Sequence, residues 1–258
     1  MQNTSLKNLQ SNCLPELKAY WNFANIQGDK VPDLSDNNSY LFATGNPTYL
    51  KDSSLTGAVN LNGSTQWLST KSSIIKTDQS FSIAAWVRIS GDLMSGNIYL
   101  KEGNNALTAI SQDSDTHAGF YLGLRKYKVS KPNNNQKVIY RWCFALAPIT
   151  MDLPGVHVCS QDILDKNDLD KWVFLVATCD IENGLVQLHI PELKQTQSTV
   201  IQDSWKLWNA TKGFQIGRGQ WEGHIVDQWP GSIGPVRVFK GVLSLEQSEL
   251  LRCEDLYN

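Results

Sequence analysis

Hydrophobic and polar residues alternate with a period of two along several segments, which is the pattern of half-buried β-strands. In 81–89 (FSIAAWVRI) every second residue is apolar, and the segments 17–23, 138–144 (VIYRWCF) and 185–190 (LVQLHI) follow the same rule. The segment 172–178 (WVFLVAT) is apolar on both faces. This last pattern indicates a central strand that is covered on both sides.

Turn-forming residues separate these segments, and each group contains glycine, asparagine, aspartate or proline, which tolerate positive φ or cap their own backbone. Many short strands joined by such turns are typical of a sandwich or barrel. We therefore predict an all-β fold, a two-sheet antiparallel jelly-roll sandwich. The turns lie at 27–29 (QGD), 36–38 (DNN), 62–63 (NG), 102–105 (EGNN), 132–135 (PNNN) and 182–184 (ENG).

One short C-terminal helix is predicted from Ser244 to Leu256. Ser244 and Gln247 have the spacing of a capping box, in which two side chains bond to each other's backbone amides. A shorter helical piece is expected near 161–169. Since no linker, repeat or low-complexity tract interrupts the pattern, residues 1–258 are expected to form a single domain with a core from about 15 to 253.

Composition and charge exclude several classes of partner. The chain has 258 residues, a formal net charge of -2 and scattered lysine and arginine, so nothing attracts it to nucleic acid or to an anionic membrane. No stretch is long and apolar enough for a transmembrane helix, and no membrane insertion is expected. The N-terminal sequence lacks the features of a signal peptide, so a cytoplasmic location is expected for the chain as written.

The five cysteines are Cys13, Cys143, Cys159, Cys179 and Cys253, and their spacing fits no zinc pattern. Without a signal peptide, reduced and mostly buried thiols are expected. The alternative is that Cys143 pairs with Cys159 across a hairpin and Cys13 with Cys253 where the termini meet.

Six blocks of sequence resemble those of laminin-G-like jelly rolls and occur in the same order. The resemblance covers nearly the whole chain and is closest to the bacterial laminin-G-like group of the concanavalin A-like lectins and glucanases. It implies two stacked antiparallel sheets with neighbouring termini, recognition of carbohydrate or protein, and an extracellular location. The blocks are GAVNLNG (57–63), FSIAAWV (81–87), KWVFLVATCD (171–180), GFQIGR (213–218), WPGSI (229–233) and VRVF (236–239).

Two positions depart from the family pattern. Gly234 and Pro235 stand where the family usually carries acidic residues, one of which helps to hold a structural calcium ion in many members. The family has an aspartate–glycine turn after the strand that corresponds to 185–190. This chain has Pro191 and Glu192 there, so that hairpin is expected to be remodelled.

The segment between Trp205 and Trp229 is rich in aromatic and polar residues, a composition that suits sugar binding. Tryptophan faces stack on the apolar side of sugar rings, and charged or amide groups bond to the hydroxyls. The alternative is that Trp205 and Trp229 are core or loop-anchoring residues, and the resemblance favours this alternative for Trp229. The predicted ligand-binding residues are Trp208, Arg218, Trp221, His224 and Asp227.

A calcium site is predicted in the polar loop that contains Asp33 and Asp36, because calcium prefers oxygen ligands from flexible loops. The alternative is a solvated turn in which these side chains cap backbone groups. No other cofactor is expected.

The sequence carries no catalytic motif: no serine elbow, phosphate-binding loop or paired zinc histidines, and no carboxylate triplet of the glucanase type. The four histidines are far apart and are expected to lie at the surface or in hydrogen bonds. We therefore predict a non-catalytic module that binds a glycan or a glycosylated surface through rim loops. The alternatives are an enzyme that uses the jelly-roll cavity, as a glycan hydrolase or lyase or a small-molecule cyclase or isomerase, and a protein–protein adhesion domain.

Overall fold

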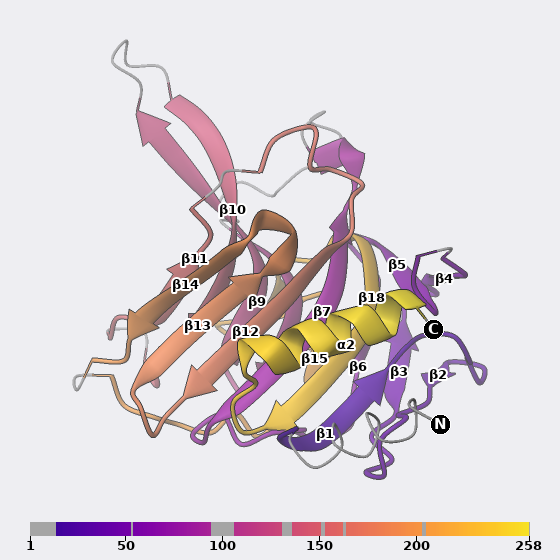
Figure 1. The fold of residues 1–258 in the computed structure, drawn as a ribbon, viewed down its shortest axis with the longest axis horizontal. Coiled ribbons are helices and arrows are strands. Elements are labelled where there is room, and N and C mark those ends of the chain that lie inside the picture. Colours follow the sequence, from indigo (N-terminus) through magenta and orange to yellow (C-terminus); the bar gives the residue numbers. More distant parts are fainter. Residues whose placement is uncertain are drawn as a thin grey trace.

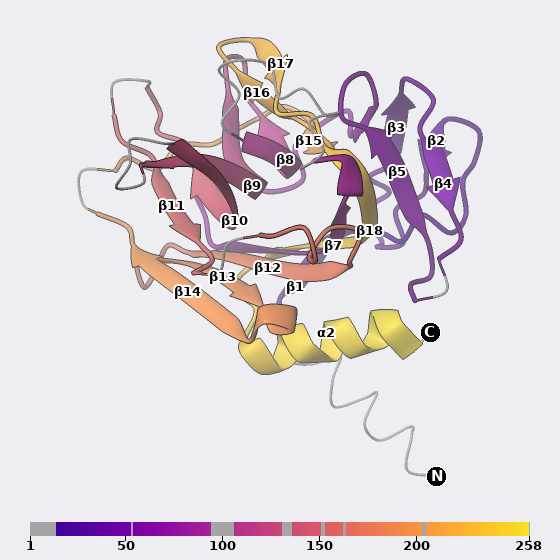
Figure 2. The ribbon, with the colours of Figure 1, turned by 90° about the horizontal axis from the view of Figure 1, so that it is seen from above.

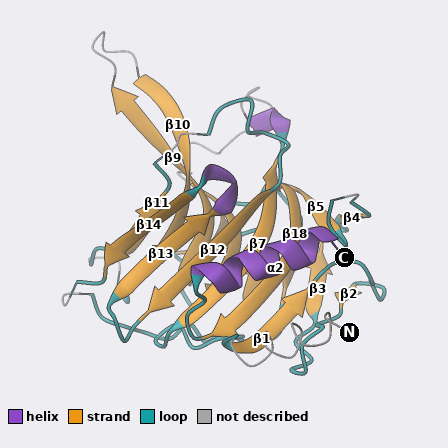
Figure 3. Ribbon diagram, viewed as in Figure 1, coloured by secondary structure: helices purple, strands orange, loops and turns teal. Residues whose placement is uncertain are grey.

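The computed structural model describes residues 14–52, 54–93, 106–130, 136–150, 153–161, 164–202 and 205–257. Their strands form two antiparallel sheets that stack face to face, and one helix lies on the outside (Figures 1, 2 and 3). The predicted all-β sandwich with one C-terminal helix is therefore confirmed.

Sheet A contains the strands that the sequence pattern predicted most clearly. The central strand β7 pairs with β12 on one side and with β18 on the other, and β1 also pairs with β18. Across the sheet the strands are β14 (Gln195–Val200), β13 (Leu185–Ile190), β12 (Val173–Asp180), β7 (Phe81–Ile89), β18 (Pro230–Lys240), β5 (Ala58–Asn62) and β4 (Thr48–Leu50), with β1 at Glu16–Trp21.

Sheet B is built around the long strands β9 and β10, which extend past their neighbours as a projecting hairpin (Figure 1). A separate two-stranded hairpin, β16 (Gly219–Trp221) with β17 (His224–Val226), follows β15. Across sheet B the strands are β11 (Val156–Cys159), β10 (Gln136–Leu146), β9 (Ala118–Ser130), β8 (Ala106–Asp113), β15 (Phe214–Ile216), β6 (Trp67–Ser69), β3 (Leu41–Thr44) and β2 (Lys30–Val31).

The core fills the space between the two inner faces and is rich in aromatic rings. Phe81 of sheet A lies 5.3 Å from Phe120 of sheet B between ring centroids. Trp229 is fully buried, as expected from the resemblance, and Trp205 is also buried. The side chains that alternate with these core residues therefore form the outer face of each sheet.

Helix α2 (Leu245–Tyr257) covers the outer face of sheet A (Figure 2). Its predicted capping box is present: the Gln247 amide donates to Ser244 Oγ at 3.2 Å, and the Ser244 amide donates to Gln247 Oε1 at 2.8 Å. Leu251 packs beneath the helix against Trp86 and Phe174 of the sheet. No helix in the described part of the chain is long and apolar enough to cross a membrane.

The prediction of a short helix near 161–169 is wrong. Residues 161 and 164–169, which the structure describes, form bends and turns, and the Leu164 amide bonds to the Tyr140 carbonyl at the edge of sheet B. Leu164 is buried there, so tertiary packing overrides the local helical tendency.

The two departures from the family pattern have local structural effects. Pro191–Leu193 forms the 3₁₀ turn η2 and ends at Lys194 with a φ of 52°, so the hairpin is remodelled as expected. The pairing of β18 with β7 shifts register between Ile233 and Val236, on either side of Gly234 and Pro235. A second 3₁₀ turn, η1, spans Gly91–Leu93.

Candidate functional site

The outer face of sheet B is the face that α2 leaves open (Figure 2). Along β9, Phe120, Leu122 and Leu124 belong to the core. The residues between them therefore point outwards, because successive side chains on a strand alternate between faces. The outward positions are Tyr121, Gly123, Arg125 and Tyr127.

An aromatic cluster of Trp208, His117 and Trp221 lies at one end of this face. The His117 ring centroid is 4.8 Å from that of Trp208 and 5.9 Å from that of Trp221, and both pairs are tilted by about 60°. His117 is buried, whereas Trp221 is 39% exposed. The cluster thus presents one indole to solvent while the other two rings support it.

Hydrogen bonds fix the His117 ring. Its Nε2 lies 2.8 Å from the Pro148 carbonyl oxygen, which can only accept, so Nε2 carries a proton. Its Nδ1 lies 2.9 Å from Thr116 Oγ1, which can donate to it. These two contacts hold the plane of the ring, so His117 can serve as a packing platform.

Trp208 is anchored by both ends of its side chain. Its Nε1 donates to the Ala147 carbonyl at 2.9 Å, and its ring packs on Tyr121 and Ala118. The Tyr121 hydroxyl in turn donates to the Gln220 carbonyl at 2.6 Å. The predicted pair Trp208 and Trp221 is thus brought together through His117 and β16, although no sequence pattern indicated a role for His117 in the site.

The turn between β16 and β17 positions Trp221. Glu222 and Gly223 have φ values of 50° and 75°, so both central residues of the two-residue turn are left-handed. Such turns match the twist of a hairpin, and glycine adopts this conformation without strain. The Gly223 amide also donates to the Thr116 carbonyl at 2.7 Å, which ties the turn to the aromatic cluster.

Arg218 has a structural contact that the sequence did not predict. Its Nη2 lies 2.8 Å from Asp113 Oδ2, both side chains are buried, and its backbone carbonyl accepts from Ser111 Oγ at 2.9 Å. Burial raises the pKa of Asp113, and the adjacent guanidinium opposes that rise. The ion pair joins the base of the β16–β17 hairpin to β8, so Arg218 supports the hairpin instead of presenting its guanidinium to solvent.

His224 and Asp227 lie on the same hairpin but in different surroundings. His224 is exposed and pairs in register with Trp221. Asp227 follows β17 with a φ of 56°, and burial raises the pKa of its carboxyl to about 6, while Arg125 acts in the opposite direction. Asp227 therefore lies near Arg125, further along the outer face than the aromatic cluster.

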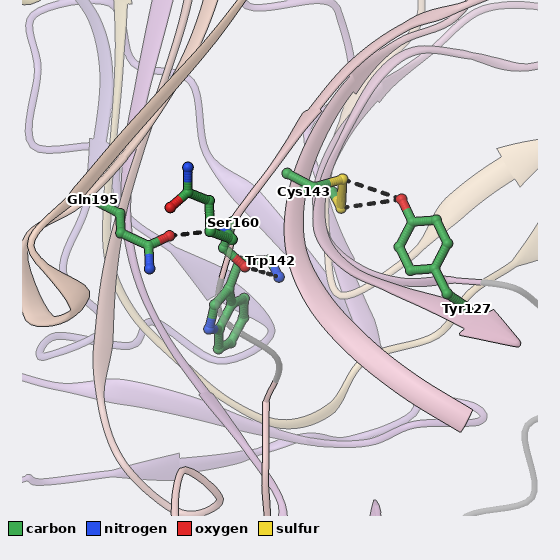
Figure 4. Close-up of a disulfide and its surroundings, with 7 residues drawn as sticks. Tyr127, Trp142, Cys143, Ser160 and Gln195 are labelled. Atoms are coloured by element: carbon green, nitrogen blue, oxygen red, sulfur yellow. Dashed lines mark hydrogen bonds between the residues drawn. A yellow bond between two sulfur atoms is a disulfide. The ribbon is translucent and has the colours of Figure 1, made fainter. Parts of the chain in front are cut away.

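A disulfide between Cys143 and Cys159 corrects the expectation of reduced thiols. The two cysteines are direct partners of β10 and β11, with Cα atoms 4.1 Å apart. The Tyr127 hydroxyl lies 3.2 Å from Cys159 Sγ (Figure 4). The alternative pairing of Cys143 with Cys159 across a hairpin is therefore confirmed. Cys179 is buried and free and Cys253 is exposed and free, whereas Cys13 lies outside the described residues.

Asp33 organises the loop in which calcium was predicted. Its two carboxylate oxygens accept hydrogen bonds of 2.8–2.9 Å from the amides of Tyr20, Ser35 and Ser39 and from the Ser35 hydroxyl. Asp36 is exposed. Among the described residues, no group of three or more histidine, cysteine, aspartate or glutamate side chains is arranged to hold a metal ion. The calcium site stays a prediction.

We expect Asp33→Ala to lower the free energy of unfolding by about 2 kcal/mol, because three amides and a hydroxyl lose their acceptor. The loss should be the same with calcium or with EDTA in urea unfolding curves. A fall in wild-type stability on adding EDTA would instead show that calcium also contributes in this loop. Asp36→Ala is the control and should leave stability nearly unchanged.

A second concave region lies on sheet B near β2 and β3. This groove has a volume of about 540 Å³ and is lined by polar side chains together with Tyr40 and Phe42. The Nζ atoms of Lys30 and Lys71 lie 5.7 and 4.9 Å from the Phe42 ring centroid. Two ammonium groups therefore already interact with the face of that aromatic ring. Tyr40 is 37% exposed and provides a matched comparison for Trp221.

No protein-family model matches the chain, and no curated protein sequence matches it. Solved structures with similar folds include botulinum neurotoxin type C, whose cell entry depends on two ganglioside molecules (13% identity, TM-score 0.63, 98% of this chain and 53% of that one). The binding domain of botulinum neurotoxin DC in complex with SialylT is also similar (14%, 0.62, 94% and 52%). So is Trypanosoma rangeli sialidase in complex with sialic acid (13%, 0.55, 90% and 32%).

These similarities show the fold. The chain spans about half the length of the toxin domains and about a third of the sialidase. The ligands of those proteins are therefore evidence about their whole chains, and function here has to be argued from the site.

Proposed function

We propose that this protein is a non-catalytic recognition module that binds a glycan or a glycosylated surface through the outer face of sheet B. Trp221 is the stacking platform; His117 packs against it, and Trp208 packs against His117. The exposed, supported indole at the open face is the observation that carries the proposal. The exposed His224 is its partner across the hairpin and supplies a polar group for sugar hydroxyls.

The rigidity of the cluster supports binding. An aromatic ring that is already ordered loses little conformational freedom when a ligand stacks on it, so more of the contact energy appears as affinity. The folds of a ganglioside-dependent toxin and of a sialidase solved with sialic acid are consistent with a role in carbohydrate recognition. The laminin-G-like resemblance supports the same class of ligand.

We also propose that the module works outside the reducing cytosol. The support is the Cys143–Cys159 disulfide, because such bonds persist in oxidising compartments and are rare in the cytosol. Thiol titration after unfolding measures whether the bond is present. It should be present in protein purified under oxidising conditions and absent in protein from a reducing cytosol.

We expect Trp221→Ala to weaken glycan binding at least tenfold, equivalent to about 1.4 kcal/mol, with little change in the unfolding temperature. The reason is that the mutation removes the exposed stacking surface and leaves the buried His117 and the half-buried Trp208 in place. Ligands would first be found on a glycan array, and the affinities then measured by calorimetry.

Tyr40→Ala is the matched control, since Tyr40 is similarly exposed but lines the separate groove. It should bind the same glycan with wild-type affinity. Unchanged binding in Trp221→Ala would contradict the proposed site, and loss of binding in Tyr40→Ala alone would move the site to the groove.

A further inference from the structure

Two arginines face each other on the outer face of sheet B. Arg125 of β9 and Arg141 of β10 are direct partners in the antiparallel register. Like charges at directly opposed positions destabilise a sheet, so this arrangement is unfavourable unless something else compensates for it. The chain has six arginines, and the salt bridges in the described residues use the other four: Arg88, Arg218, Arg237 and Arg252.

The side chains of Arg125 and Arg141 are both partly buried. Arg141 Nε is shielded from solvent and has no hydrogen-bond partner among the described residues. A buried N–H without an acceptor is costly, and an anion that binds the guanidinium offsets this cost. Each guanidinium carries five N–H donors in a planar fork that matches a carboxylate or a sulfate, and the register places two such side chains opposite each other.

The groups around the pair limit what can bind there. Asp227 lies near Arg125, where the guanidinium opposes the raised pKa of the carboxyl. Burial, and next Arg125, lower the pKa of His157 on β11, so that ring tends to be neutral. The buried Thr108 Oγ1, opposite Gly123 in the register, has no partner among the described residues. The surface therefore has two unpaired cations and one nearby carboxylate, which favours a single acidic group over a polyanion.

The arginine pair and the aromatic cluster belong to one continuous face. Tyr121, which packs on Trp208, is four residues from Arg125 on β9, so their Cα atoms are about 13 Å apart. Tyr121 and Gly123 are buried beneath the β16–β17 hairpin. The Tyr121 hydroxyl donates to the Gln220 carbonyl, and the amide of Thr108, the register partner of Gly123, donates to the Asp227 carbonyl. An oligosaccharide that stacks on Trp221 at the tip of this hairpin would reach the arginines along the outside of the hairpin.

We propose that Arg125 and Arg141 together bind the carboxylate or sulfate group of an acidic glycan whose sugar rings contact the aromatic cluster. This inference rests on the proposed function and adds the ligand class: an acidic sugar in place of a neutral one. The overall charge of -2 argues against nucleic acid as the source of the anion, since no wider basic surface would attract a phosphate backbone.

The test compares matched neutral and acidic oligosaccharides by calorimetry. Oligogalacturonate is measured against its methyl ester, and a sulfated galactan oligosaccharide against its desulfated form. The wild-type protein should prefer one acidic member at least tenfold, and Arg141→Gln should reduce that preference to less than about threefold. Its affinity for the neutral member should not change. Whether the carboxylate or the sulfate pair shows the preference identifies the group.

Two variants serve as controls. Lys240→Gln removes one positive charge from the end of β18 in sheet A and should keep the wild-type preference. Asp227→Asn should increase the preference, because it removes the carboxylate that competes for Arg125, and asparagine tolerates the positive φ at this position. The unfolding temperature of Arg141→Gln should not fall, since the substitution removes a like-charge contact.

The outcomes separate this inference from the proposed function. Binding of neutral and acidic sugars with equal affinity would overturn the arginine site and leave the glycan-binding proposal intact. If no sugar binds, inorganic sulfate is tested by thermal shift. Stabilisation by sulfate that Arg125→Gln/Arg141→Gln abolishes would keep an anion site but overturn the glycan as its ligand, and no stabilisation would overturn both.

Discussion

Replacement of Asp255 by alanine is expected to lower the free energy of unfolding by about 3–5 kcal/mol. Asp255 of α2 lies beneath the helix, where both carboxylate oxygens accept from Arg237 Nη1 at 2.7 and 2.8 Å. Trp86 Nε1 donates to the same carboxylate at 3.0 Å. All three side chains are buried, so the variant leaves the Arg237 guanidinium in the interior with only the exposed Glu254 carboxylate, 3.6 Å from its Nη2, as a counter-ion. The measurement is urea unfolding monitored by tryptophan fluorescence.

The paired replacement Arg237→Leu/Asp255→Leu is the control. It removes both charges, so it should be clearly less destabilising than Asp255→Ala even though it changes two residues. The centroid of the Tyr20 ring is 4.0 Å from the Arg237 guanidinium carbon, and this ring can pack against arginine or leucine at position 237. A double variant that is as unstable as the single one would show that the ion pair itself, not the unpaired charge, determines the effect.

This ion pair illustrates what the sequence could and could not predict. The block VRVF predicted β18 and the capping box predicted α2, and both are confirmed. Nothing in either pattern showed that Arg237 and Asp255 would meet, because that contact depends on how the helix crosses the sheet. Local periodicity determines the elements, whereas packing between distant elements determines the buried polar contacts.

In the candidate site, too, local patterns predicted some residues, and contacts between distant segments could not be predicted. Trp208 and Trp221 were predicted from their polar neighbours, and the structure places both in one cluster. His117 was missed because it comes from the β8–β9 turn, about a hundred residues earlier in the chain, and only the tertiary fold brings it between the two indoles. Arg218 was predicted to be a ligand-binding group, but its partner Asp113 lies on a different strand, whose register no sequence pattern reveals.

The two outer faces of the sandwich differ in a way that favours one of them for binding. On sheet A, α2 covers apolar residues, and the one buried arginine there is neutralised by an aspartate from the helix. On sheet B, the outward residues include two arginines for which no salt bridge is found among the described residues, and the adjoining β16–β17 hairpin carries an exposed indole. The face with unsatisfied polar groups and an accessible ring is the one suited to a polar ligand.

Removal of the disulfide, by Cys143→Ala together with Cys159→Ala, is expected to cost about 3 kcal/mol, because the bond closes a loop of 16 residues in the unfolded chain. For a chain of this size the unfolding midpoint should fall by roughly 6–12 °C. Scanning calorimetry of the variant measures this change. Wild-type protein in dithiothreitol should show the same fall if the reductant reaches the bond.

The same variant separates stability from recognition. Arg125 and Arg141 are on β9 and β10, whereas the disulfide joins β10 to the edge strand β11. The preference for acidic sugars should therefore persist at temperatures where the variant is folded, even though its midpoint is lower. Cys179→Ala, which removes a buried free thiol from sheet A, is the control for loss of side-chain volume. If the double variant keeps the wild-type midpoint, the bond does not stabilise the protein, and its support for an oxidising compartment is removed as well.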